Sequence, residues 1–171
     1  MGNIFKRILN FCKTINSLVI INLYIFIEKN LYKEKKIILF YFPVKSYQEN
    51  LIELIDKLKE NKNYKILLGY NFGTSKEIKK YKNSFFLNLG YLKYLFDLDI
   101  FISSYIVYTL PKAKNRIYIN HDIYDAPMVS RDKEINLTKS FFNYDHIFTS
   151  SNITSNMMKN KINQLYDKKN Y

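Results

Sequence analysis

The pattern of apolar and polar residues along the chain predicts strands that alternate with helices. Residues 35–43 are a continuous apolar run of strand length, which is typical of a buried parallel strand. Ser46 and Glu49 then match a capping box, and apolar residues recur on one helix face over residues 51–58. The same reading predicts further strands at 64–70, 84–89, 99–104, 116–120 and 145–150, and further helices at 74–81, 91–96, 137–143 and 152–166.

This alternation favours an α/β fold with a mostly parallel sheet and helices on both of its faces. The 171 residues suit one domain, which we place at 35–171. Residues 1–34 are predicted to form a separate helical segment, because apolar residues recur there at helical spacing between Lys6, Arg7 and Lys13. The sequence therefore predicts a single α/β domain that follows an N-terminal basic and apolar helix.

The N-terminal segment has two interpretations. Its apolar run at 15–27 is shorter than the roughly 20 residues that span a bilayer, and no small-residue cleavage site follows it. One interpretation is a helix packed on the domain. The other is a basic helix that lies on a membrane surface and gives the chain a peripheral membrane contact.

The composition of the chain limits the chemical classes of partner that it is expected to bind. The net charge of +12 favours an anionic partner, but only three of the 27 basic residues are arginine, which argues against nucleic acid. An anionic lipid or a phosphorylated substrate fits this charge better. Cys12 is the only cysteine, so the chain has no internal disulfide and fits a reducing, cytoplasmic compartment.

Polar residues follow several of the predicted strands, where ligands bind in parallel sheets. His121 could take a proton from a hydroxyl nucleophile, and Asp122 or Asp125 could orient its ring. The alternative is that these residues form a turn and that the paired serines cap helices, while His146 is structural. No glycine-rich phosphate loop or metal-ligand spacing occurs, so we expect no metal and no cofactor. The candidate residues are His121, Asp122 and Asp125 for catalysis and Ser103, Ser104, Ser150 and Ser151 for substrate binding.

Four segments carry a resemblance to a known family: KKIILFYFP at 35–43, DIFISS at 99–104, RIYINHD at 116–122 and YDHIFTSS at 144–151. In their order and spacing they resemble the N-terminal half of the CDP-glycerol glycerophosphotransferases, which build teichoic-acid-like wall and capsule polymers. That family is similar to GT-B glycosyltransferases, with two Rossmann-like domains that face a cleft. The resemblance implies a Rossmann-like domain on the acceptor side of such an enzyme.

The resemblance also implies roles and partners. His121 matches the catalytic histidine of the family's His-Gly motif, although Asp122 stands here in place of the glycine. The donor would be CDP-glycerol or a similar activated nucleotide, and the acceptor a lipid-linked or glycan hydroxyl at the inner face of the bacterial plasma membrane. A second transferase domain, supplied in trans or lost, would complete the cleft, so this chain alone is expected to be inactive. The alternatives are a non-catalytic α/β remnant, a membrane-associated binding module, or an RNA-binding domain.

Overall fold

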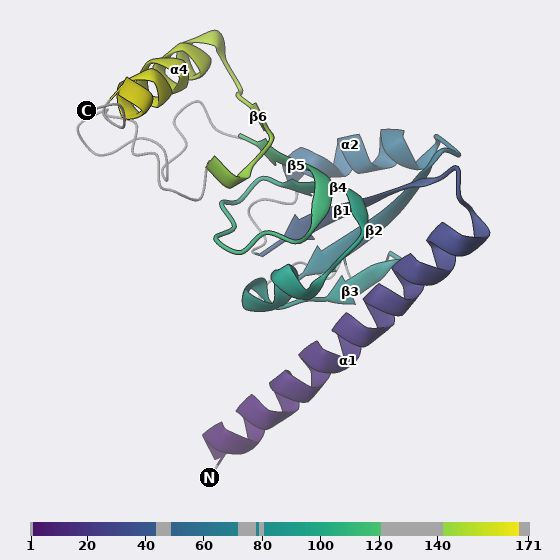
Figure 1. The fold of residues 1–171 in the computed structure, drawn as a ribbon. Coiled ribbons are helices and arrows are strands. Elements are labelled where there is room, and N and C mark those ends of the chain that lie inside the picture. The colour runs from purple at the N-terminus through teal and green to yellow at the C-terminus, as the bar shows by residue number, and fades with distance from the viewer. Residues whose placement is uncertain (1, 44–48, 72–77, 79–80, 121–141, 168–171) are drawn as a thin grey trace.

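The computed structural model describes residues 2–43, 49–71, 78, 81–120 and 142–167. These residues form a six-stranded sheet in the order β3-β2-β1-β4-β5-β6, in which all neighbouring strands are parallel (Figure 1). This is the strand order of the doubly wound Rossmann fold, so the predicted α/β class and parallel sheet are confirmed. In chain order the elements are α1 (Gly2–Leu31), β1 (Lys36–Phe42), α2 (Glu49–Lys59), β2 (Tyr64–Tyr70), β3 (Ser84–Phe86), the 3-10 helix η2 (Leu89–Tyr94), β4 (Leu98–Ser103), β5 (Ala113–Ile119), β6 (His146–Phe148) and α4 (Asn152–Asp167).

The central strand β1 is buried on both faces because nearly all of its residues are apolar. It pairs with β2 on one side and with β4 on the other, and every residue after Lys36 is buried. Successive side chains of a strand point to opposite faces, so β1 contributes to two separate clusters. Ile38, Phe40 and Phe42 belong to the cluster of Leu51 and Ile55 on α2, whereas Ile37, Leu39 and Tyr41 belong to the cluster of Leu18, Ile21 and Ile25 on α1.

The long helix α1 runs antiparallel to the strands of the sheet. Near the C-terminal end of α1, Glu28 forms an ion pair of 2.7 Å with Lys65, which is the second residue of β2. One turn earlier, the Tyr24 ring lies 6.0 Å from the ring of Phe85, which pairs with Gly69 near the carboxyl end of β2. The N-terminal end of α1 therefore lies toward the carboxyl edge of the sheet, and the first turns of α1 project away from the sheet (Figure 1).

A buried carboxylate ties α1 to the opposite, amino edge. Asp99 of β4 accepts a hydrogen bond from the backbone N–H of Ile37 at 2.9 Å, and it forms an ion pair with Lys114 at 2.7 Å. Lys29 of α1 lies 3.8 Å from the same carboxylate and 2.7 Å from Asp97. Burial by itself would raise the pKa of Asp99, but these donors and positive charges outweigh it and lower the pKa. The ionised Asp99 therefore joins β1, β4, β5 and α1.

The helix is longer than the apolar run at 15–27. Residues Leu9–Leu31 form a helical stretch that is long and apolar enough to cross a membrane by length and composition. The core helix of a protein and a signal sequence can have the same length and composition, so this property is weak evidence for a membrane. The predicted N-terminal apolar helix is confirmed, and its apolar surface extends over more residues than the run indicated.

Two predicted strand boundaries differ from the structure by three residues. β3 ends at Phe86 rather than at residue 89, because Asn88 already caps η2 by accepting a hydrogen bond from the N–H of Gly90. β5 begins at Ala113, which pairs with Leu98, three residues before the predicted start. The predicted cap at Ser46 lies outside the described residues, as do most of the predicted helices at 74–81 and 137–143.

Candidate functional site

The strand order puts a topological switch point at the carboxyl edge between β1 and β4. From β1 the chain continues outward to β2 and β3, and it then returns to the other side of β1 to form β4. Connections that leave two adjacent parallel strands in opposite directions open a crevice, and ligands of doubly wound folds bind there. Ser103 is the last residue of β4 and pairs in register with Tyr41 of β1. Ser103 and Ser104, both predicted to bind substrate, therefore lie at this switch point, and both are buried.

The Ser103 hydroxyl is engaged locally. It donates to the carbonyl oxygen of Tyr105 at 2.9 Å and accepts from the N–H of Tyr105 at 3.1 Å. These two bonds end β4 and turn the backbone, a common role of serine beside a turn. Binding of a ligand by the Ser103 hydroxyl would require that hydroxyl to exchange one of these bonds.

Tyr144, which the sequence analysis did not single out, supports the segment that follows Ser104. Its buried hydroxyl accepts from the N–H of Val107 at 3.1 Å and donates to the carbonyl of Tyr105 at 3.2 Å. Burial raises the pKa of Tyr144, so the phenol stays protonated and can serve as a donor at neutral pH. Its place next to Asp145 just before a predicted strand gave no sign of this contact with a segment 37 residues earlier.

β5 leads directly to the principal candidate residue. The strand pairs with β4, and the next residue, Asn120, is buried and donates its backbone N–H to the carbonyl of Phe148 at 2.8 Å. This bond fixes the carboxyl end of β5 beside β6. His121, Asp122 and Asp125 follow Asn120 in the sequence and lie outside the described residues. The catalytic roles assigned to these three residues stay predictions.

The serines after β6 divide into an exposed residue and a helix cap. Ser150 is exposed, two residues after the end of β6. The Ser151 hydroxyl accepts from the N–H of Thr154 at 3.1 Å and lies 3.0 Å from the Thr154 hydroxyl. Ser151 thus caps the start of α4, which is the alternative interpretation of the serine pair. Ser103 ends β4 and Ser151 comes shortly after the carboxyl end of β6 in the same sheet. Because β5 lies between these two strands, the two serines are not neighbours.

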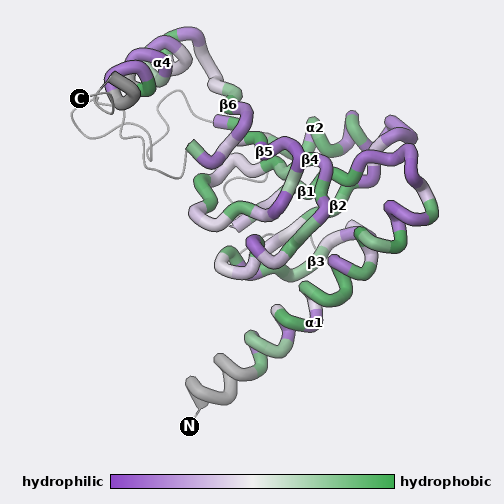
Figure 2. The backbone as a smooth tube through the Cα atoms, in the orientation of Figure 1, coloured by the Kyte–Doolittle hydropathy of each residue, from purple (hydrophilic) through white to green (hydrophobic). Residues whose placement is uncertain are grey.

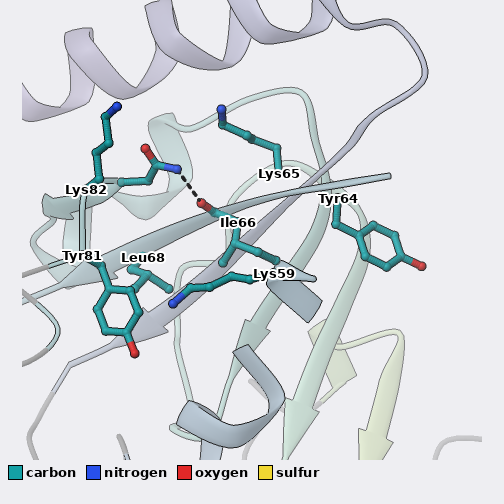
Figure 3. Close-up of a pocket in the computed structure, with 8 residues that line it drawn as sticks. Lys59, Tyr64, Lys65, Ile66, Leu68, Tyr81 and Lys82 are labelled. Carbon is teal, nitrogen blue, oxygen red and sulfur yellow. Dashed lines mark hydrogen bonds between the residues drawn. The ribbon is translucent and has the colours of Figure 1, made fainter. Parts of the chain in front are cut away.

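A hollow of about 380 Å³ lies near the amino end of β2, away from this switch point (Figure 3). Lys59, Lys65 and Lys82 line it, yet in Figure 3 Lys65 and Lys82 point toward one side of the sheet and Lys59 lies on the other. Lys65 is paired with Glu28, and Lys59 lies 3.1 Å from a carboxylate oxygen of Asp56. Since the three ammonium groups do not converge and two are already paired, the hollow is a poor site for a phosphate.

The remaining titratable residues that the structure describes give no cluster suited to a metal. Within the described ranges, no group of three His, Cys, Asp or Glu side chains is placed to hold an ion. His146 is exposed at the amino end of β6, and its Nε2 lies 3.3 Å from Oδ1 of Asn115. His146 is therefore at the opposite end of the strand from the switch point. Its neighbour Asp145 forms a bidentate pair with Arg116, which lowers the pKa of Asp145 and joins β6 to β5.

Comparisons of the chain with protein-family models, curated proteins and solved structures find no match. The resemblance to the glycerophosphotransferases therefore stays a prediction based on the four sequence segments. What the structure supplies is a Rossmann-like sheet with buried polar residues at the carboxyl ends of β4 and β5.

Proposed function

We propose that this chain is the acceptor-side domain of a transferase that moves glycerol phosphate, or a related polyol phosphate, from CDP-glycerol to a hydroxyl acceptor. The observation that carries the proposal is the strand order, which puts Ser103 at the switch point where doubly wound folds bind phosphorylated ligands. The fold alone is shared by many functions. The choice of a glycerophosphotransferase rests on the resemblance of the four segments, and the net charge of +12 agrees with phosphorylated substrates.

In the proposed reaction the acceptor hydroxyl oxygen attacks the β-phosphorus of CDP-glycerol. The bond between the β-phosphorus and the bridging oxygen breaks, CMP leaves with that oxygen, and His121 accepts the proton of the acceptor hydroxyl. Asp122 or Asp125 would support the resulting imidazolium. A second domain, in trans, would supply most contacts to the nucleotide. The reaction would take place at the inner face of a bacterial plasma membrane.

Complementation in the native cell tests this proposal, because the cell supplies any partner domain. Deletion of the gene should lower the transfer of labelled glycerol phosphate from CDP-glycerol into isolated membranes, and the wild-type gene should restore it. His121→Ala should not restore transfer, whereas Lys57→Ala on α2 should restore it fully. Full transfer with His121→Ala, at equal protein level, would refute the proposed base.

The second candidate is a non-catalytic α/β module. It is favoured by the hydroxyls of Ser103 and Ser151, which are already used in a turn and a helix cap. This candidate predicts that deletion of the gene leaves transfer into membranes unchanged. The complementation experiment therefore separates the two candidates before any variant is made.

A further inference from the structure

The outward face of α1 is apolar although no part of the described chain covers it. The inward face consists of Leu18, Ile21 and Ile25, which are buried against the sheet. On the opposite face large apolar side chains are exposed, and Phe26 for example is 62% exposed. Figure 2 shows hydrophobic residues, in green, along α1, including the stretch that projects from the sheet. The exposed set on α1 is Leu9, Phe11, Ile15, Val19, Ile20, Leu23, Phe26, Ile27 and Leu31.

The helix η2 extends this apolar surface beyond α1. The Asn22 side chain donates to the carbonyl of Tyr94 at 3.0 Å and accepts from the N–H of Phe96 at 3.4 Å, so this segment is held against the helix. The rings of Phe11 and Tyr91 meet edge to face at 6.4 Å. Tyr94 and Phe96 are 52% and 51% exposed. Two segments about 70 residues apart in the sequence therefore form one apolar surface.

Between the two helices this surface is hollowed into a groove of about 830 Å³. Apart from Asn22, its lining consists of aliphatic and aromatic side chains, and no charged residue takes part. A cation stands at the border instead, because the exposed Lys93 has its ammonium 5.0 Å from the centre of the Tyr94 ring, and a second lysine, Lys13, is exposed elsewhere on α1. Tyrosine and lysine side chains with apolar bodies and polar ends are typical of residues at a membrane surface.

We propose that α1 and η2 together form a docking surface for an anionic phospholipid bilayer, with α1 lying in the plane of the membrane. The occupant follows from the charge: an apolar groove bordered by Lys93, on a chain of net charge +12, complements anionic headgroups above acyl chains. This proposal names the surface that would make the peripheral membrane contact expected from the sequence. Membrane binding by this surface is compatible with either candidate function.

The contacts of α1 favour the in-plane orientation over a helix that crosses the bilayer. To cross, α1 would have to leave the sheet, which would expose the cluster around Ile21 and break the ion pair between Glu28 and Lys65. A helix that keeps these contacts can still immerse its outward face.

Because α1 is antiparallel to the strands, its N-terminal turns extend past the carboxyl edge of the sheet (Figure 1). A membrane that covers α1 and η2 therefore lies along the side of the domain that leads to the switch point at Ser103. An acceptor hydroxyl close to the membrane surface would be near the end of the sheet where ligands are expected to bind.

The single cysteine offers a direct probe. Cys12 is exposed on α1, seven and fourteen residues before Val19 and Phe26, so it shares their face. A polarity-sensitive fluorophore on Cys12 of the full chain should shift to the blue with phosphatidylglycerol–phosphatidylcholine vesicles. The shift should be much weaker with pure phosphatidylcholine and should decline as salt rises.

Variants at the end of η2 and just after it test the two-part surface with unlabelled protein in a vesicle co-sedimentation assay. The double variant Tyr94→Ser, Phe96→Ser should lower the partition coefficient about tenfold, since two half-exposed aromatic side chains lose their apolar contact. Phe148→Ser is the matched control, because Phe148 is 58% exposed on β6, away from the groove, and its variant should bind as the wild type does.

Three results would overturn the proposal. The first is equal vesicle binding by the double variant and the control. The second is resistance of the membrane-bound chain to alkaline carbonate extraction, which indicates a helix that crosses the bilayer. The third is a stable dimer that shields Cys12 and binds no vesicles, which would make a second copy the occupant. Vesicle binding needs no donor nucleotide, so its failure is distinct from failure of the transferase proposal.

Discussion

Replacement of Asp99 by asparagine tests whether the buried carboxylate stabilises the packing of the central strands against α1. Asparagine keeps the shape of the side chain and one oxygen that can accept from the Ile37 N–H, but it removes the negative charge. The variant therefore loses the ion pairs with Lys29 and Lys114 and weakens one buried hydrogen bond. Asp99→Ala goes further, because it leaves the Ile37 N–H without its acceptor.

The expected loss of stability follows from these contacts. A hydrogen bond to a charged group contributes about 1 kcal/mol more than a neutral one, which applies to the buried Ile37 N–H. The pair with Lys29 at 3.8 Å adds about 0.5 kcal/mol, and water screens the mostly exposed Lys114. Asp99→Asn should therefore cost about 1.5 kcal/mol, or roughly 3–6 °C in Tm for a chain of this size. Asp99→Ala should cost about 1–3 kcal/mol more because it leaves a buried donor unpaired.

Urea denaturation followed by circular dichroism at several pH values is the assay. The pKa of Asp99 is lowered in the folded state, so its stabilising effect is complete above the unfolded pKa of about 3.9. It is lost as the pH falls through the folded pKa. The difference in unfolding free energy between wild type and Asp99→Asn should be largest near pH 7 and should shrink below about pH 4.

Asp56→Asn provides the control, because Asp56 is exposed on α2, where it pairs with Lys59 and accepts a long hydrogen bond of 3.5 Å from the Tyr81 hydroxyl, and asparagine keeps an oxygen for that bond. It should change stability by less than about 0.5 kcal/mol. Equal urea midpoints for wild type and Asp99→Asn at pH 7 would show that the buried carboxylate does not fasten the strands. A difference that grows below pH 4 would contradict the lowered pKa.

Three further substitutions test other contacts. Ser151→Ala removes the cap of α4 and should cost about 1 kcal/mol in unfolding free energy, measured by urea denaturation. Tyr144→Phe leaves the buried Val107 N–H without its acceptor and should lower stability by about 1–2 kcal/mol in the same assay. At Gly69 an added Cβ would lie 3.1 Å from the Tyr41 ring, so Gly69→Val should lower the Tm by several degrees in a thermal melt, as overpacking by about 1–3 kcal/mol implies.

The strands and helices with strong local patterns could be predicted from the sequence. The continuous apolar run of β1 and the one-sided apolar face of α2 locate these elements within a few residues. The order of the strands in the sheet was not predictable in this way, because β3 and β4 are placed by crossovers rather than by their own composition. Short edge strands such as β6 also carry little pattern, since two of its three residues are exposed.

The candidate site was predictable only as a set of strand ends. Parallel strands put Ser103 and Asn120 at one edge, as expected from the alternation of elements. The sequence could not show that Ser103 is already bonded to Tyr105, because turn hydroxyls and ligand-binding hydroxyls look alike in sequence. The same holds for the groove between α1 and η2, since contacts across about 70 residues leave no mark in a local pattern.

The central claim, that the carboxyl edge between β1 and β4 binds the phosphorylated acceptor, is tested most directly by nuclear magnetic resonance. The isotopically labelled chain would be titrated with glycerol 3-phosphate, a soluble analogue of a polyol-phosphate acceptor, up to millimolar concentration, and amide shifts would be recorded at both edges of the sheet. We predict shifts at Ser103, Ser104 and Asn120, with Lys36 and Tyr64 at the amino edge unchanged. Shifts confined to Lys36 and Tyr64, or no shift at either edge, would contradict the claim.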